Sequence, residues 1–288
     1  MRESARDRLN FFSRQSIRMS MQATSPREKL LATAETLKVL PTLSTIIDEV
    51  LRILADDNSS FHTLFNVVRY DQAISSKVIS IANSAYFNRG TQIVHLERAM
   101  VSIGFDEIRR IVMCLVFLKE MLGRWKLSQE DLASLWSHTL SVACAGKVLA
   151  EKTMLEDHEK VFTVSILHDL GKVPLFLYGD RYRKMREEAR STERDICPLE
   201  REAFGIDHAE LGHFMAVKWR FPEEFAAVIL RHHSPKEKED PLVDIVAKAD
   251  MFIDRPGVDL GPAGAILKEE AERIKAETTR VAGLLGVS

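Results

Sequence analysis

The chain has 288 residues, of which 45% are apolar and 28% are charged, as in a globular protein of one or two domains with its own core. Its net charge is −2, so no strong positive field favours binding to nucleic acid. The longest apolar run, IVMCLVFL at 111–118, falls far short of the roughly 20 residues that span a bilayer. We therefore expect neither a nucleic-acid-binding nor a membrane-spanning protein.

The N-terminal residues 1–25 carry scattered arginines and no long apolar core, so they do not resemble a secretory signal. We expect a partly ordered polar arm; the alternative is a helix that docks on a partner or a membrane surface. Cys114, Cys144 and Cys197 are isolated, so disulfides and a cysteine metal cage are not expected. This pattern favours a cytoplasmic location.

Nearly every periodic segment has helical spacing. Between 40 and 54, six apolar residues fall on one helical face, and no stretch alternates with period two long enough to predict a sheet. The sequence therefore predicts an all-α protein. In the first half, the expected helices cover 40–54, 60–71, 75–87, 95–105 and 106–122.

The second half begins with a cap-like pair, Ser128 and Asp131, before a long helix at 132–152. Further expected helices include a charged one at 180–190 and an amphipathic one at the C-terminus. We predict a bundle of two packed helical subdomains with a soft boundary near residue 125. The predicted units are the arm 1–25, an N-terminal subdomain 26–125, a second subdomain 126–256 and a C-terminal extension 257–288.

The stretch SILHDLGKVPL at 165–175 places His168 and Asp169 at the end of a buried helix, before the stop signal Gly171. The partial negative charge at a helix C-terminus disfavours a carboxylate there. A cation should offset it, and the candidates are Lys172 and a metal ion.

Other histidines and acids also lie near helix ends or on apolar helix faces. His208 opens a helix behind an Asp207/Glu210 capping box, and His232 and His233 end the helix that starts near Pro222. The full candidate set is His138, His168, Asp169, His208, His232, His233 and Asp250. In a helical bundle, such positions can converge on one cavity.

Each candidate also has a purely structural explanation. His138 could be a packing residue, and paired histidines at a helix end could complement the helix dipole. Asp250 could pair with Lys248, and Asp169 with Lys172. None of these explains why so many imidazoles and carboxylates fall on successive helices.

Imidazoles and carboxylates without thiolates suit Fe, Mn, Zn or Ni. Seven ligands are too many for one tetrahedral ion, whereas two ions about 3.5–4 Å apart and bridged by Asp169 would use them all. Such a pair clamps a phosphate and generates a hydroxide nucleophile from water.

The second half resembles the HD superfamily of metal-dependent phosphohydrolases in HDLGK at 168–172, DHAELG at 207–212 and AKAD at 247–250. From about residue 35 to 255, the chain resembles the HDOD family more closely. That family is a bacterial signalling relative of the HD-GYP phosphodiesterases. The first-half features are LPTLSTIIDEVLRIL, VISIANSAYF and IVHLERAMVSIGFDEIRRIV.

The resemblance implies two divalent ions, with Fe or Mn favoured, and catalytic roles for Asp169 and Lys172. Lys172 matches a lysine that can approach a phosphate, although it could instead pair with Asp169 or cap the helix. The implied ligands of one ion are His138, His168, Asp169 and Asp250. The implied ligands of the other are Asp169, His208, His232 and His233.

Two departures from the HD-GYP pattern argue against a third metal and against hydrolysis of cyclic di-GMP. SPKEKEDP, not a Gly-Tyr-Pro loop, follows His233, and Ser134 stands where the trinuclear sites have Glu. HDOD proteins are generally viewed as regulatory or scaffolding.

We therefore expect a signal-transduction protein that acts through a regulatory protein partner and carries a His/Asp metal site. The alternative is a metal-dependent phosphohydrolase acting on a phosphoester or nucleotide. Arg109 and Arg110 are the only hint of nucleic-acid binding, and apolar turns follow them.

Overall fold

The computed structural model describes residues 25–36, 50, 52–53, 60–88, 90–116, 127–219, 221–234 and 240–285. Its described residues form helices and turns with no strand, so the predicted all-α class is confirmed. The predicted arm, up to residue 24, and nearly all of the predicted helix 40–54 lie outside the described residues.

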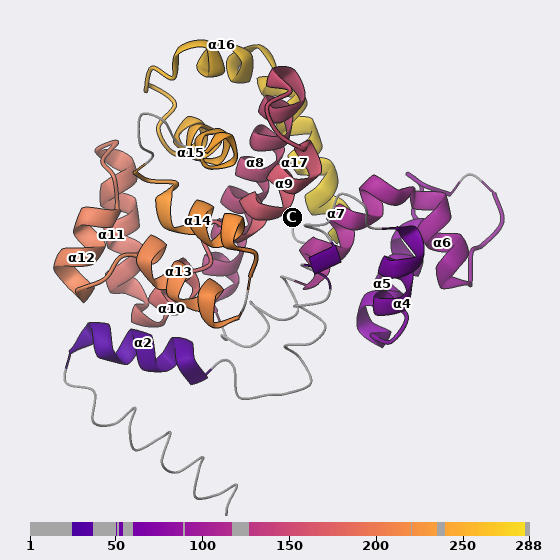
Figure 1. Ribbon diagram of the computed structural model, residues 1–288, viewed down its shortest axis with the longest axis horizontal. Helices are drawn as coiled ribbons and strands as arrows, with labels where there is room; N and C mark the ends of the chain where they lie inside the picture. Colours follow the sequence, from indigo (N-terminus) through magenta and orange to yellow (C-terminus); the bar gives the residue numbers. More distant parts are fainter. Residues whose placement is uncertain are drawn as a thin grey trace, which may run out of the picture.

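The first half forms a lobe of short helices (Figure 1). Its members are α4 (Phe61–Val68), α5 (Gln72–Ala82), α6 (Leu96–Ile103) and α7 (Phe105–Val116). Gly104, with φ of +91°, makes the sharp break between α6 and α7, a conformation that glycine adopts without a Cβ clash. Helix α7 contacts the other three, and it also contacts α9 and α17 of the second half.

The second half packs around α8 (Gln129–Thr153), which contacts α9 (His158–Leu167), α15 (Pro241–Asp254), α16 (Gly261–Glu269) and α17 (Ala271–Leu285). The predicted cap of α8 is confirmed, since the Ser128 side chain accepts a hydrogen bond from the backbone N–H of Asp131. The remaining elements are α10 (Lys172–Leu175), η2 (Phe176–Tyr178), α11 (Asp180–Ser191), α12 (Cys197–Phe204), α13 (His208–Lys218) and α14 (Glu223–Arg231).

Helix α2 (Pro26–Thr36) lies against α10 and α13 in the second half, although the sequence places it at the start of the predicted first subdomain (Figure 1). Leu30 and Ala34 are buried there, and Glu35 lies 3.7 Å from the Lys218 ammonium. The boundaries at 125 and 256 stay predictions.

Within the residues that the structure describes, the helical stretch 158–178 contains an 18-residue window apolar enough to meet the length and composition test for a membrane span. Because 89% of that window is buried against the other helices, its apolar character is explained by the core.

A buried ionic network joins the lobe to the second half through α7. Arg110 pairs with Glu107 on its own helix and with Glu159 in the first turn of α9. Arg280 of α17 makes two hydrogen bonds to Glu107, at 2.9 and 3.0 Å. Arg109 and Arg110 are both buried, so they do not form an exposed basic stripe.

Replacing Arg110 with alanine should lower the free energy of unfolding by about 1–3 kcal/mol, because Glu159 and Glu107 each lose a cation while Glu159 keeps the Lys147 ammonium at 3.0 Å. Urea denaturation measures this. Arg98→Ala, on the exposed face of α6, is the control and should change stability by less than about 0.5 kcal/mol. Equal effects of the two substitutions would contradict a stabilising role for the network.

Candidate metal centre

His168 and Asp169 lie in the turn that follows α9, not in its last helical turn. Helix α9 ends at Leu167, His168 is its C-cap, and residues 168–171 form the turn before α10. Both side chains are buried, at 0% and 2% exposure. Pro174 falls inside the short α10, so the chain resumes helical geometry directly after the stop signal Gly171.

The predicted capping box at the start of α13 is confirmed. The Asp207 carboxylate accepts a hydrogen bond from Glu210 N at 2.8 Å, and Glu210 reaches back to the Asp207 N–H. It fixes His208 as the first residue of the helix. His232 and His233 directly follow α14, with His232 as its C-cap, also as predicted.

His138 and Asp250 come from the middle of α8 and the last turns of α15, two helices that pack against each other. All seven predicted residues therefore converge from five elements of the second half. Their burial, from 12% exposure of the His138 side chain to none at His168, His208 and His232, separates them from ordinary surface histidines.

A close backbone contact makes this convergence geometrically feasible. A Cβ on Gly171 would stand 1.9 Å from the His208 carbonyl oxygen and 2.5 Å from Gly212 N. Gly171 has a φ of −70°, so the position needs glycine for space and not for backbone freedom. The turn that carries Asp169 can therefore approach the first turn of α13.

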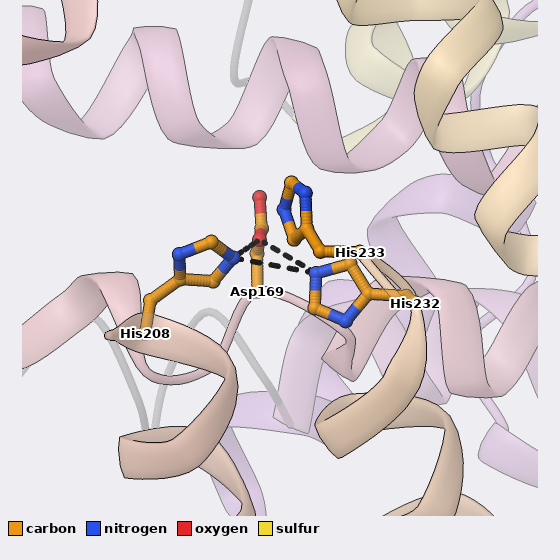
Figure 2. Close-up of side chains that lie close together, drawn as sticks. All are labelled: Asp169, His208, His232 and His233. Atoms are coloured by element: carbon orange, nitrogen blue, oxygen red, sulfur yellow. Dashed lines mark hydrogen bonds and ion pairs between the residues drawn. The ribbon is translucent and has the colours of Figure 1, made fainter. Parts of the chain in front are cut away.

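The seven side chains form two groups that share one neighbourhood. Each group brings its potential ligand atoms within 4.8 Å of one another: Asp169 with His208, His232 and His233, and His138 with His168 and Asp250. Figure 2 shows the Asp169 carboxylate between the rings of His208 and His232. These two groups contain the residues of the two ligand sets that the family resemblance implies, except that Asp169 belongs to the first group alone.

Asp169 presents a different oxygen to each group. Its Oδ1 lies 3.3 Å from His208 Nε2 and 3.7 Å from His232 Nε2. Its Oδ2 lies 3.1 Å from His138 Nε2 and 3.3 Å from His168 Nε2. A carboxylate in this position can bridge two cations, one held by each group.

The histidine rings are oriented through their Nδ1 atoms. His168 Nδ1 donates to the Ser165 carbonyl at 2.6 Å, and His232 Nδ1 donates to the Ile229 carbonyl at 2.9 Å. A carbonyl can only accept, so in both rings Nδ1 carries the proton and a neutral ring directs its Nε2 lone pair into the site, where His232 Nε2 lies 3.3 Å from His208 Nε2.

In the other three rings, Nδ1 lies near a carboxylate. His208 Nδ1 is 2.7 Å from Glu200, His138 Nδ1 is 3.1 Å from Asp254, and His233 Nδ1 is 3.2 Å from Asp195. Metal-bound imidazoles commonly have such acceptors behind them.

Glu200, Asp195 and Asp254 are missing from the sequence prediction. Asp254 could have been found, because it lies one helical turn after Asp250 on α15. Glu200 stands on α12, eight residues before His208, and no periodic pattern connects the two. Its carboxylate is fully buried and accepts hydrogen bonds from Tyr182 OH and from the His208 backbone N–H, both at 2.7 Å.

Several buried atoms at the site lack a hydrogen-bond partner among the described residues. They are the Nε2 atoms of His138 and His168, both ring nitrogens of His233, and the Oδ1 atoms of Asp169 and Asp250. Orphaned buried donors and acceptors are costly, and a bound cation would satisfy them together. The residues therefore fit a divalent metal site.

The charges at the site also favour a bound cation. Burial opposes a charge on His168, yet Asp169 and Asp250 raise its pKa to about 9. Burial likewise opposes ionisation of Asp169, but the charges of His168 and Lys172 hold its pKa well below its ordinary value. Burial and the neighbouring His233 lower the pKa of His232 to about 3. The ionised carboxylates thus stabilise positively charged groups at this site. Metal binding would displace protons from histidine.

The structural alternatives have mixed outcomes. Lys172 donates to Asp169 Oδ2 at 2.6 Å, so the predicted lysine–aspartate pair forms. Lys248 pairs with Asp244 at 2.6 Å, so the suggested Lys248–Asp250 pairing is wrong: Lys248 and Asp244 lie one helical turn apart on the same face. Ser134 accepts a hydrogen bond from Arg186 at 2.9 Å.

The site forms one wall of a cavity of about 580 Å³. His138, Lys172, His233 and Asp250 line it, together with Asp254. Cavities of this size take small-molecule ligands. A ligand could therefore reach the carboxylates and imidazoles from solvent.

Gly171→Ala should lower the free energy of unfolding by about 1–3 kcal/mol or more, because backbone atoms must move to admit the new Cβ. Chemical denaturation measures the change. Gly283→Ala, in α17 with no atom within 4 Å of the added Cβ, should leave stability unchanged or raise it by up to about 1 kcal/mol. An unaltered Gly171→Ala protein would contradict the close-contact interpretation.

Glu200→Gln should weaken metal binding by about 10- to 100-fold while the fold is retained, because the isosteric amide loses the charge behind His208. Competition with a chelator measures the affinity. The control, Glu202→Gln, alters an exposed residue of the same helix and should bind metal as the wild type does. Wild-type affinity in Glu200→Gln would contradict this role.

Comparison with known proteins agrees with this description. A family model for the HDOD domain matches residues 40–235, more than half of the chain. A curated but uncharacterized protein of Treponema pallidum (strain Nichols) is 24% identical over 253 residues, which cover 84% of this chain. This chain spans only 47% of the length of that relative.

Solved structures share the fold at low sequence identity. An HDOD domain protein of unknown function from Geobacter sulfurreducens has a TM-score of 0.67 and 22% identity, over 89% of this chain and 98% of its own. A candidate phosphohydrolase from Shewanella amazonensis has a TM-score of 0.62 and 24% identity, over 86% and 97%. From the family match and the shared fold, we conclude that the chain belongs to the HDOD family.

Proposed function

We propose that the protein is a metal-dependent phosphohydrolase that acts on a phosphoester or nucleotide through a dinuclear centre. The observation that carries the proposal is the position of Asp169, which offers one carboxylate oxygen to each of two histidine groups beside a cavity. An unreactive structural metal site would usually be closed to ligands.

The donor set favours Fe or Mn, with Zn or Ni as alternatives, because it contains imidazole and carboxylate groups but no thiolate. His138, His168, Asp169 and Asp250 would hold one ion, and Asp169, His208, His232 and His233 the other. When bound, such a pair supplies Lewis acidity and lowers the pKa of a water molecule that attacks phosphorus.

The chain's own residues would orient the substrate. Lys172 lines the cavity while its ammonium contacts Asp169 Oδ2, so it stands where a phosphoryl oxygen would enter. Burial opposes the charge on Lys172, but Asp169, Asp254 and Asp250 raise its pKa, so it stays protonated at neutral pH. Lys172 would therefore stabilise negative charge on the phosphate.

Regulation through a protein partner is the second candidate function. It is favoured by large apolar side chains exposed on the α4–α6 lobe: Tyr70 (77%), Tyr86 (58%), Val94 (63%) and Val101 (65%). Where such groups lie side by side, they form the kind of apolar patch that often marks an interaction surface. In that case, the metal centre would have a structural role.

Metal content and hydrolysis, measured on the same protein samples, test the two candidates. The wild type should contain about two metal equivalents by elemental analysis and should hydrolyse at least one member of a panel of phosphomonoesters, phosphodiesters and nucleotides with added Mn or Fe. Asp169→Ala should lose both metal and turnover, because it removes an oxygen from each group.

Asp244→Ala is the matched control, since Asp244 is a carboxylate of α15 that pairs with Lys248 outside the site. It should keep metal and activity. Wild-type metal content in Asp169→Ala would refute the ligand assignment. Stoichiometric metal without turnover of any substrate would favour the regulatory candidate.

A further inference from the structure

Arginines line the part of the cavity beyond the metal centre. Arg183, Arg186 and Arg190 recur at spacings of three and four residues along α11, so they share one helical face. Arg194 follows in the connection to α12, and Arg255 caps the C-terminus of α15. Three separate segments therefore bring guanidinium groups to one cavity.

Two of these arginines have structural partners. Arg183 binds the Asp131 carboxylate at 3.0 and 3.2 Å, and Arg186 donates to Ser134 while it lies over the Phe176 ring. These contacts hold α11 against the start of α8. The contacts of Arg183 and Arg186 therefore orient α11 so that its arginine-bearing face is turned toward the cavity.

Arg190, Arg194 and Arg255 have no ion pair within the part of the chain that the structure describes. Arg190 and Arg194 are also exposed, so their side chains are available to a ligand. Three acids, Glu130, Glu187 and Asp195, also line this part of the cavity, against five arginines, of which Arg183 is paired with Asp131. The outer part of the cavity thus has an excess of positive charge.

The inner part of the cavity has the opposite character. Asp250 and Asp254 line it beside His138 and Lys172, and Asp169 lies directly behind Lys172. The cavity therefore has an inner end suited to metal-assisted binding of one phosphoryl group and an outer end suited to a second anion. Guanidinium groups bind phosphoryl and carboxylate oxygens with paired hydrogen bonds, and the metal site at the inner end favours phosphate as the anion.

We propose that the cavity binds a small ligand with at least two phosphoryl groups, of the pyrophosphate or nucleoside polyphosphate class. One phosphoryl group lies at the inner end beside Lys172, and the other contacts Arg190, Arg194 and Arg255. This inference rests on the proposed phosphohydrolase function and names its substrate class. The volume of about 580 Å³ suits a nucleotide-sized molecule.

Calorimetric titration of the purified protein with inorganic pyrophosphate and, separately, with inorganic phosphate tests this proposal. Metal content is measured before and after each titration, because pyrophosphate itself binds divalent ions. The wild type should bind pyrophosphate at least about tenfold more tightly than phosphate, since only pyrophosphate can reach both ends of the cavity.

Arg190→Gln and Arg194→Gln should each weaken pyrophosphate binding by about tenfold and change phosphate binding by less than about twofold, with metal content unaltered. Lys184→Gln removes one charge from an exposed position of the same helix, outside the cavity lining, and should bind both probes as the wild type does.

Three results would overturn the proposal: equal wild-type affinity for the two probes, unchanged pyrophosphate binding in both arginine variants, or a loss of affinity that follows metal loss. These outcomes are separate from failure of the proposed function. Absence of turnover, or metal retained in Asp169→Ala, refutes the hydrolase assignment without any arginine substitution.

Discussion

The site depends on how closely the turn after α9 approaches the first turn of α13. Gly171 has no side chain, and this absence lets its backbone lie against the His208 carbonyl and Gly212 N. On the other side of that contact, Gly212 is close to Ile229 of α14, the helix that His232 directly follows. Two glycines, both without a Cβ, therefore let Asp169, His208 and His232 occupy the same small volume.

Once the backbone permits the approach, polar groups behind the rings determine what the rings can do. Carbonyls accept from Nδ1 of His168 and His232, and Glu200 accepts from His208. These acceptors leave Nε2 facing the carboxylates. The centre combines ring orientation set by hydrogen bonds with negative charge that buried aspartates supply. Both features favour a bound cation over a neutral packed core.

The sequence predicts much of this centre because helix ends have local signals. The Asp207/Glu210 capping box placed His208, and the glycine in HDLGK marked a helix end near Asp169, which the structure places in the turn just after the helix. Family resemblance then sorted the seven residues into the two groups that the structure brings together. Helical periodicity also predicted the all-α class, because apolar faces repeat along nearly every segment.

Other features depend on tertiary contacts that have no local signal. Glu200 matters only because α12 packs beside the start of α13, and its buried carboxylate then faces His208. The placement of α2 against α10 and α13 likewise joins segments more than 130 residues apart, as in the contact between Tyr178 OH and the Pro26 carbonyl with a sequence separation of 152. The pairing of Lys172 with Asp169, by contrast, could be predicted from the sequence, because the two residues are only three positions apart in one turn.

The central claim is that two cations share the Asp169 carboxylate. Anomalous diffraction from crystals of the purified protein, recorded on both sides of the Fe and Mn absorption edges, tests it most directly. The account predicts two peaks about 3.5–4 Å apart, one beside each Asp169 oxygen. A single peak, or density at this position without any anomalous signal, would contradict it.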